Sequence, residues 1–275
     1  MKVSVLMAAY NSNSELLKLS VMSVINQTFK DFEFIIVDDG SKSPIEPVVR
    51  QISNDERIVV YRKDNSGLGS SLTYGIGKAK GEYIARIDDD DLMVPRRLEL
   101  QVKYLDEHPE VSCVGGHMFF YNRNRYIPYR KFPLDHEGIV ESMLSRKWAM
   151  AHSALMYRKE SVIKAGYYRL KGTGEDLDLI LQLSLVGKLA NIDDYLIYYH
   201  LSVGSLSSTN SQLPGHAFAL REYKKSEEYS KNAEIVDNSL AHIEQEMNES
   251  KKHLNWKRWG MIKYIGLFGK KMIGG

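Results

Sequence analysis

The sequence contains very little cysteine. Its 275 residues include one, Cys113, which excludes an internal disulfide framework and any metal site built from cysteines alone. Proteins without disulfides are typical of reducing compartments, so a cytoplasmic location is expected.

Long apolar runs are also missing. No uninterrupted stretch of about 18 apolar residues, the length that crosses a bilayer, occurs in the chain. The first residues, MKVSVLMAAYNS, hold too short an apolar run for a secretory signal. The sequence therefore predicts neither a membrane span nor a cleaved leader.

Acidic residues are absent from the C-terminal end. Residues 251–275 contain seven Lys or Arg and no Asp or Glu, and among them lie Trp256, Trp259 and Phe268. Of the 37 basic residues, 30 remain in residues 1–250 against 35 acidic ones, so the body is mildly acidic. A basic amphipathic tail with tryptophans suits an anionic membrane surface; packing on its own body or in a homodimer is the alternative. Nucleic acid is not expected as a partner, because the basic patch is short and no recognised binding module accompanies it.

The rest of the chain is typical of a soluble α/β protein, with 43% hydrophobic and 26% charged residues. Short β-branched runs at 3–9, 34–37, 58–61 and 83–87 predict buried parallel strands, and helical segments separate them. The first helix is expected to begin at Asn13 or Ser14 and to bury Leu16, Leu19 and Val24. This alternation predicts an α/β fold with an open, mostly parallel, doubly wound sheet.

The second half is less regular. A helix after Pro95 should bury Leu98, Val102 and Leu105, and a helix over 174–187 should end at Gly187. Further strands are expected at 111–116, 153–157 and 195–200. A heptad-like stripe then predicts a helical arm, with these apolar positions: Val236, Leu240, Ile243, Met247 and Leu254.

Carboxylates follow two of the predicted strands. Asp38 and Asp39 come after the second, and four consecutive aspartates, Asp88 to Asp91, come after the fourth. The carboxyl ends of parallel strands meet at one edge of a sheet, where ligands bind. Crowded carboxylates resist ionising together unless water or a cation neutralises them.

Four interpretations of the cluster compete. A solvated helix start accounts for Asp91 but not for all four aspartates. An EF-hand calcium loop needs a central glycine, which DDDDLMVPRRLE lacks. A phosphohydrolase usually places its aspartate nucleophile after the first strand of the fold, whereas three strands precede this one. The fourth interpretation is a Mg²⁺ or Mn²⁺ site holding a diphosphate, since hard cations prefer carboxylate oxygens and share their coordination shell with phosphates.

Four segments, in order, resemble the motifs of the family-2 inverting glycosyltransferases: VSVLMAAYN, QTFKDFEFIIVDDGS, KGEYIARIDDDDLMVPRRLELQ and GEDLDLILQL. The similarity covers residues 2–208. A lone Asp-x-Asp pair is unspecific, but four motifs in the family's order are not. The resemblance implies the nucleotide-sugar-binding α/β fold called GT-A, with an Asp-x-Asp metal motif.

The resemblance also implies a nucleotide pocket. Ala8, Ala9 and Tyr10 match its first-strand side, with simple packing as the alternative for Tyr10. Asp39 would accept a hydrogen bond from a ring N–H of uracil or guanine.

A cation site is implied by the same resemblance. Asp88 and Asp90 match the Asp-x-Asp pair, one carboxylate near the ribose and the other, Asp90, on a Mn²⁺ or Mg²⁺ ion that bridges the diphosphate. Asp88 is a second candidate metal ligand, and Asp89 is expected to share the ribose contact. His200 stands where relatives often carry arginine, so it is a candidate for phosphate or metal, or simply ends a strand.

The catalytic base is expected in TGEDLD. Asp176 matches the family's catalytic aspartate, and Glu175 is the supporting or alternative carboxylate. The acceptor hydroxyl must lose a proton as it attacks the anomeric carbon, which a carboxylate in a partly closed site can take. Without the upstream motifs, both residues would be interpreted as acids of a first helical turn. His152 is a candidate for the acceptor wall, with a buried, hydrogen-bonded histidine as the alternative.

The predicted organisation is a catalytic domain over 1–208, with a nucleotide-binding half (1–116) and an acceptor half (117–208), and a helical arm with a basic tail over 209–275. The predicted function is inverting transfer of a sugar from a UDP-linked donor to a hydroxyl of a glycan or lipid-linked oligosaccharide. It would serve cell-surface polysaccharide synthesis, in the cytoplasm or at the inner face of the membrane. The alternatives are a catalytically silent nucleotide-sugar or glycan-binding protein and a metal-dependent phosphohydrolase.

Overall fold

The computed structural model describes the chain except for residues 123–124, 130, 171, 202–209 and 270–275, and its description of side chains stops at Ser250. The apolar and basic side chains of the tail therefore lie outside the described residues.

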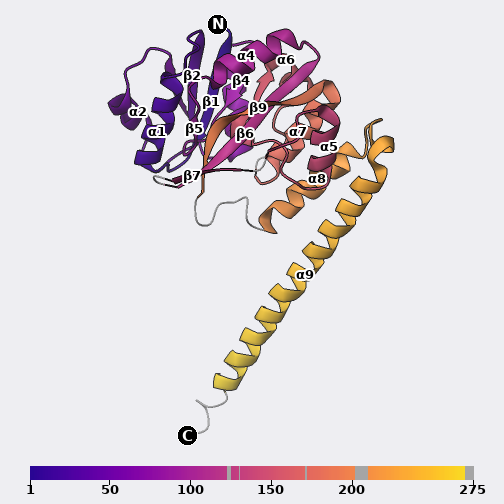
Figure 1. The fold of residues 1–275 in the computed structure, drawn as a ribbon. Helices are drawn as coiled ribbons and strands as arrows, with labels where there is room; N and C mark the ends of the chain where they lie inside the picture. The colour runs from indigo at the N-terminus through magenta and orange to yellow at the C-terminus, as the bar shows by residue number, and fades with distance from the viewer. Residues whose placement is uncertain (123–124, 130, 171, 202–209, 270–275) are drawn as a thin grey trace.

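The N-terminal half is the predicted succession of strands and helices (Figure 1). Its elements are β1 (Val3–Ala9), α1 (Ser14–Ile25), β2 (Phe32–Asp38), α2 (Glu46–Ile52), β3 (Ile58–Arg62), α3 (Leu68–Lys78) and β4 (Tyr83–Arg86). The four strands are parallel, in the order β3-β2-β1-β4. Their carboxyl ends therefore lie at one edge of the sheet, at the bottom of Figure 1.

The second half completes a nine-stranded mixed sheet in which β4 is followed by β8, β6, β9 and β5, and β7 pairs with β6. Its elements are β5 (Leu92–Met93), α4 (Arg97–Glu107), β6 (Val111–Asn122), β7 (Arg125–Pro128), α5 (His136–Leu144), a 3₁₀ turn (His152–Ala154), β8 (Met156–Arg158), α6 (Lys159–Lys164), α7 (Glu175–Val186) and β9 (Lys188–His200). Strand β8 is antiparallel to both neighbours, while β6 and β9 run parallel. The predicted α/β fold is confirmed, and the parallel arrangement is confined to the first four strands and the β6–β9 pair.

Two apolar cores lie on opposite faces of the sheet, because side chains alternate along each strand. Val5 and Met7 of β1 face the core shared with α1, α2 and α4, whereas Leu6 faces the core shared with α3, α5, α6 and α7. Both faces are covered, which explains why the parallel strands read as unbroken apolar runs.

Helix α1 begins as predicted but buries a different stripe. The Asn13 side chain accepts hydrogen bonds from the backbone N–H groups of Glu15 and Leu16, so Asn13 is the N-cap. The buried apolar residues are Leu17, Val21 and Val24, while Leu19 is 49% exposed and Leu16 partly buried. The predicted Leu16 and Leu19 were therefore wrong as core positions, because spacings of four and three residues place Leu17, Val21 and Val24 on one face.

The arm packs on the body over its first turns. Helices α8 (Leu213–Tyr223) and α9 (Tyr229–Gly269) follow the undescribed segment. Val236, Leu240 and Ile243 are buried in the same core as α5 and α7, and Met247 packs against it. Most of the predicted stripe therefore contacts its own chain, whereas Leu254 lies outside the described side chains. The boundary at residue 208 stays a prediction.

Two glycines let the starts of α7 and α8 approach closely. Gly174 has φ +83°, and a Cβ placed on Gly215 would lie 2.0 Å from the carbonyl oxygen of Thr173. The contact with Thr173 leaves no room for a side chain on Gly215. The left-handed backbone conformation of Gly174 disfavours a side chain there as well. This contact holds the first turn of α7 against α8.

Gly215→Ala is expected to lower the free energy of unfolding by about 1–3 kcal/mol, because backbone must move to admit the methyl group. The matched control is Gly77→Ala in α3, where a Cβ meets nothing within 4 Å. That exposed helical position should instead gain about 0.5–1 kcal/mol. Urea denaturation of both variants checks this; equal effects would contradict the close contact.

Among the described residues, no helix combines the length and the apolar character that crossing a bilayer requires.

Candidate active site

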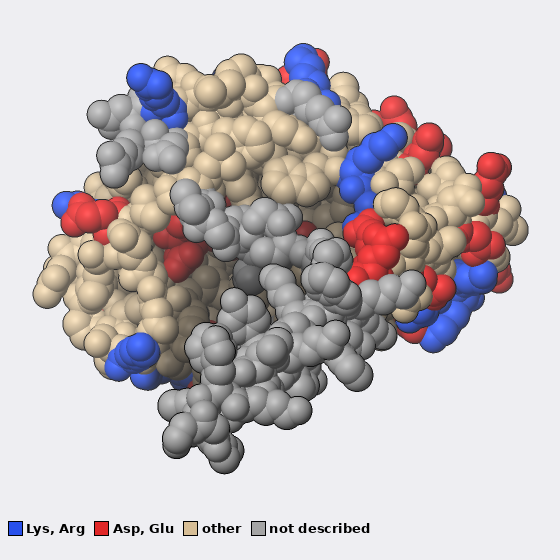
Figure 2. Space-filling model, turned by 90° about the horizontal axis from the view of Figure 1, so that it is seen from below, with Lys and Arg blue, Asp and Glu red and all other residues tan. Residues whose placement is uncertain are grey.

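A cavity of about 540 Å³ opens at the carboxyl edge of the sheet, where the end of β4 meets the starts of α7 and α8. Its walls include Asp88 and Asp90 after β4, Glu175 and Asp176 at the start of α7, and His200 at the end of β9. Figure 2 views the molecule from below, the side of the strand ends in Figure 1. Among the described residues, most of the visible surface is uncharged, and acidic side chains lie on both sides of the grey residues as well as at the edge of the view. The predicted carboxylates of β4 and α7 therefore share one space.

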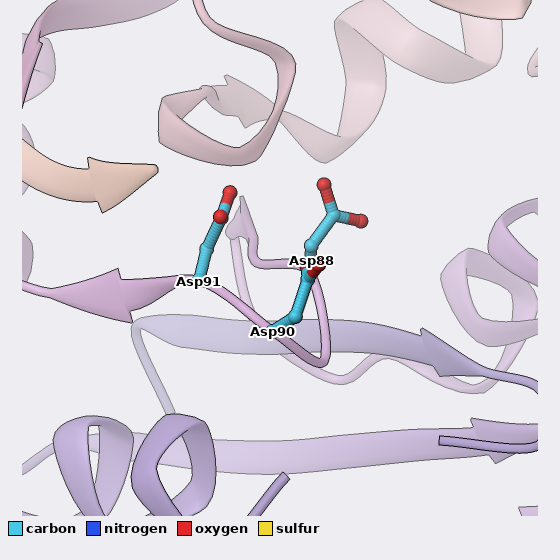
Figure 3. Close-up of side chains that lie close together, drawn as sticks. All are labelled: Asp88, Asp90 and Asp91. Atoms are coloured by element: carbon cyan, nitrogen blue, oxygen red, sulfur yellow. The ribbon is translucent and has the colours of Figure 1, made fainter. Parts of the chain in front are cut away.

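Three of the four consecutive aspartates converge. Asp88, Asp90 and Asp91 each offer a carboxylate oxygen within 4.8 Å of the others, and their side chains rise from one side of the turn after β4 (Figure 3). Asp91 is buried; its oxygens accept hydrogen bonds from the Ser153 hydroxyl and, at 2.7 Å, from the His200 backbone N–H. It does not line the cavity, so its role is to tie the turn to β9 and the 3₁₀ turn.

Asp88 and Asp90 are the two aspartates that face the cavity. The carboxylate of Asp88 is paired with the buried guanidinium of Arg86, whose Nε atom has no hydrogen-bond partner in the described part of the chain. Burial, followed by the charge of Asp88, raises the pKa of Asp90 above its ordinary value. The nearby His200 and the charge of Arg86 act in the opposite direction but only partly offset this effect, so the ionised form of Asp90 is incompletely compensated in this structure.

The donor set fits a divalent cation. His200 places its Nδ1 atom 3.4 Å from Asp90 Oδ2, too far for a strong hydrogen bond, and that nitrogen is buried without another partner among the described residues. Carboxylate oxygens with one imidazole suit Mn²⁺, and carboxylates alone suit Mg²⁺.

Asp89 turns away from its neighbours. Its carboxylate accepts a hydrogen bond from the Ser12 hydroxyl in the loop after β1, and it is not part of the cavity wall. Burial, together with the charges of Asp88 and Asp90, raises the pKa of Asp89 to about 6. The predicted ribose contact thus involves a side chain already engaged with the β1–α1 loop.

Asp39 is buried and holds the loop before α3. It accepts hydrogen bonds from the Lys63 ammonium at 2.6 Å and from the backbone N–H groups of Ser66 at 3.0 Å and Gly67 at 2.9 Å. Burial opposes the charge of Asp39, but these donors outweigh it and hold the pKa of the carboxyl below its ordinary value. Oδ2 accepts one of these bonds and so has a second lone pair, but Asp39 is not among the residues that line the cavity.

The other predicted base-pocket residues lie at the end of β1, outside the cavity wall. Ala9 is buried, Ala8 partly buried, and Tyr10 is 53% exposed. Simple packing, the alternative for Tyr10, does not account for so much exposed ring.

Glu175 and Asp176 form the first turn of α7, where the helix dipole favours negative charge. Glu175 is largely buried, and burial, with the neighbouring charge of Asp176, raises its pKa to about 7. Asp176 is less buried and accepts a hydrogen bond from the Leu177 N–H at 2.7 Å. Both residues line the cavity. Glu175, which binds a proton near neutral pH, therefore lies beside the more exposed carboxylate of Asp176.

Two histidines complete the wall. His152 hydrogen-bonds Tyr168 through Nε2 at 2.7 Å, and burial, with the charge of Arg86, lowers its pKa well below the ordinary value. It therefore lines the cavity as a hydrogen-bonded, neutral histidine, and its contact with an acceptor stays a prediction. His216 of α8 was missed from the sequence, since only the packing of Gly174 against Gly215 brings it to the cavity.

Comparison with known proteins identifies the family of this chain. The family described as glycosyl transferase family 2 matches residues 4–166. The amylovoran biosynthesis glycosyltransferase AmsE of Erwinia amylovora is 30% identical over 198 residues, 70% of this chain and 74% of that protein. The O-antigen biosynthesis glycosyltransferase WbnJ of Escherichia coli is 31% identical over 186 residues, 66% of this chain and 71% of that protein.

The fold has solved counterparts as well. Residues 1–349 of S. aureus TarS, in complex with UDP-GlcNAc, superpose with a TM-score of 0.70 at 19% identity, covering 87% of this chain and 72% of that chain. This likeness confirms the predicted GT-A type of fold. With the family match over more than half of its length, the chain belongs to glycosyl transferase family 2 and is a glycosyltransferase.

Proposed function

We propose that this glycosyltransferase moves one sugar, with inversion, from a UDP-linked donor to a hydroxyl of a glycan or lipid-linked oligosaccharide during cell-surface polysaccharide synthesis. The observation that carries the proposal is the single cavity shared by Asp88 and Asp90 of the β4 turn and by Glu175 and Asp176 of α7. Relatives named for amylovoran and O-antigen biosynthesis support the class of product. The UDP-GlcNAc complex of TarS supports a UDP-linked donor.

Asp90, with Asp88 and His200, would hold Mn²⁺ or Mg²⁺. When bound, such an ion stabilises negative charge on the departing nucleoside diphosphate. At the other end of the donor, the free lone pair of Asp39 would accept a hydrogen bond from the uracil N–H, close to Ala8, Ala9 and Tyr10. Asp88 and Asp89 are proposed for the ribose.

Asp176 is proposed as the general base. It takes the proton of the acceptor hydroxyl while that oxygen bonds to the anomeric carbon and the bond from this carbon to the diphosphate oxygen breaks. One displacement opposite the leaving group inverts the configuration, so an α-linked donor gives a β-glycoside. Glu175 is proposed as the supporting or alternative carboxylate beside Asp176, and His152 is proposed as part of the acceptor wall.

The tail beyond residue 250 is proposed to contact an anionic membrane surface, where lipid-linked acceptors reside. Co-sedimentation with vesicles containing anionic lipid should fall strongly when the chain is truncated after Ser250. Equal sedimentation of both proteins, or none by the full chain, would contradict this contact.

The rate should depend on the ionisation of Glu175, whose pKa is raised to about 7. Protonation of Glu175 below that pH removes a negative charge beside the proposed base, which weakens the local attraction for the acceptor proton, so kcat/KM should fall as pH decreases through about 7. Glu175→Gln should be slow and lack this limb. An unchanged limb in the variant would assign it to another group.

Product analysis tests the proposed function directly. The protein is incubated with Mn²⁺ and, in turn, UDP-glucose, UDP-galactose and UDP-GlcNAc, with and without methyl glycosides as acceptors. Release of UDP with a new glycosidic proton of inverted configuration by NMR supports the proposal. Retained configuration contradicts the mechanism, inorganic phosphate indicates a phosphohydrolase, and nucleotide binding without UDP release indicates a silent binder.

A further inference from the structure

Trp148 presents a partly exposed indole to the cavity. The side chain is 39% exposed and lines the wall, although large apolar rings are usually buried. Phe120, Tyr129 and Tyr199 support it, with ring centroids 6.5, 6.0 and 5.9 Å away. The indole is therefore held by other rings while part of it remains open to a ligand.

The backbone that places Trp148 is fixed by the end of α5. Arg146 has φ +59°, and the N–H groups of Arg146 and Lys147 bond to the carbonyls of Met143 at 3.0 Å and Ser142 at 2.8 Å. This is a Schellman ending with a non-glycine residue in the left-handed region, which persists only where surrounding contacts impose it. Arg146 also pairs with Glu246 of α9 at 2.9 Å, so the arm holds the turn that carries Trp148.

His216 belongs to the same cavity but comes from α8. Its Nδ1 atom is buried and has no hydrogen-bond partner among the described residues. Burial lowers the pKa of His216, although the charge of Asp176 acts in the opposite direction. A neutral imidazole therefore lies within electrostatic reach of the proposed base and can exchange hydrogen bonds with a hydroxyl.

We infer that Trp148 and His216 form the subsite for the acceptor sugar. The indole covers the C–H face of a pyranose, and the imidazole hydrogen-bonds a ring hydroxyl, which holds the attacking hydroxyl toward Asp176. A pyranose fits better than a purely apolar group, because the wall combines aromatic rings with polar side chains, among them Lys147 and Gln212. His216 lies beyond the residues matched by the family, so this subsite would set acceptor choice in this chain. The inference rests on the proposed function.

Fluorescence provides the test, because the chain has three tryptophans and the other two, Trp256 and Trp259, lie in the tail. In a full-length Trp256→Phe, Trp259→Phe background, Trp148 is the sole tryptophan. The probes are methyl β-glycosides of glucose, galactose, N-acetylglucosamine and glucuronic acid, titrated after saturation with UDP and Mn²⁺. At least one should produce a saturable change in emission, about tenfold weaker in affinity after His216→Ala.

Saturation-transfer NMR with the same glycosides gives a second measurement. Trp148→Ala should abolish the signal, Trp148→Phe should keep part of it, and Tyr126→Ala, which removes an exposed ring on β7, should leave it intact. No saturable response from any glycoside while UDP still binds would overturn the subsite and leave the proposed function standing. Failure of UDP itself to bind would overturn both.

Discussion

Replacing Asp176 by Asn should lower the rate of sugar transfer by about 10²–10⁴-fold, the usual contribution of a general base. The carboxylate oxygen that takes the proton is replaced by an amide that cannot, while the shape of the side chain is kept. Affinity for the UDP-sugar should change little, because the proposed donor contacts come from the β4 turn and from Asp39. Single-turnover transfer and calorimetric donor binding, measured on the same preparation, separate the two effects.

The matched control for Asp176 is Glu137→Gln, which removes a carboxylate from the first turn of α5, outside the cavity. If Asp176 served only the dipole of α7, both variants would lose about 0.3–1 kcal/mol of stability and neither would lose turnover. Preserved turnover in Asp176→Asn would contradict the assignment of Asp176 as the base and leave Glu175 as the candidate.

Replacing Asp90 by Asn should have opposite effects on stability and on activity. Without a divalent cation the variant should be more stable than the wild type, because a partly buried negative charge next to Asp88 and Asp91 is removed. With Mn²⁺ at about 100 times its dissociation constant, the wild type should gain about 2.7 kcal/mol and the variant much less. Turnover should fall by about 10²–10³-fold, reflecting the several kcal/mol that a metal ion contributes.

Thermal denaturation with and without Mn²⁺ measures this pattern. Asp31→Asn is the control, since Asp31 is exposed and precedes β2 at the opposite end of the sheet. A Mn²⁺-induced shift of equal size in wild type and Asp90→Asn would remove Asp90 from the cation site.

Much of the N-terminal half could be predicted from the sequence because local rules agree with the fold there. Buried runs such as Phe34 to Val37 can only be covered strands, and residues that directly follow them must lie at the sheet edge. This placed Asp88 and Asp90 correctly at the cavity without any tertiary information. Within α1, the local apolar pattern left the phase of the buried stripe open, so Leu19 was assigned to a core that Leu17 occupies.

The different contacts made by each of the four aspartates could not be predicted from the sequence. Asp91 accepts hydrogen bonds from Ser153 and His200, and Asp89 accepts one from Ser12. These partners are far from the aspartates in the sequence. The same holds for Trp148, which is supported by rings from distant strands, and for His216, which reaches the site through the glycine contact between α7 and α8. No local pattern distinguishes such residues, because tertiary packing alone gives them a role.

The most direct test of the central claim is calorimetric titration of UDP, GDP, dTDP and CDP into the wild type and Asp90→Asn, with and without Mn²⁺. The predicted result is binding of UDP that requires Mn²⁺ and is lost in the variant, with weaker or no binding of the other three. Absence of binding by all four nucleotides would contradict a donor site at Asp88 and Asp90 and leave the aspartates with a structural role in the turn after β4.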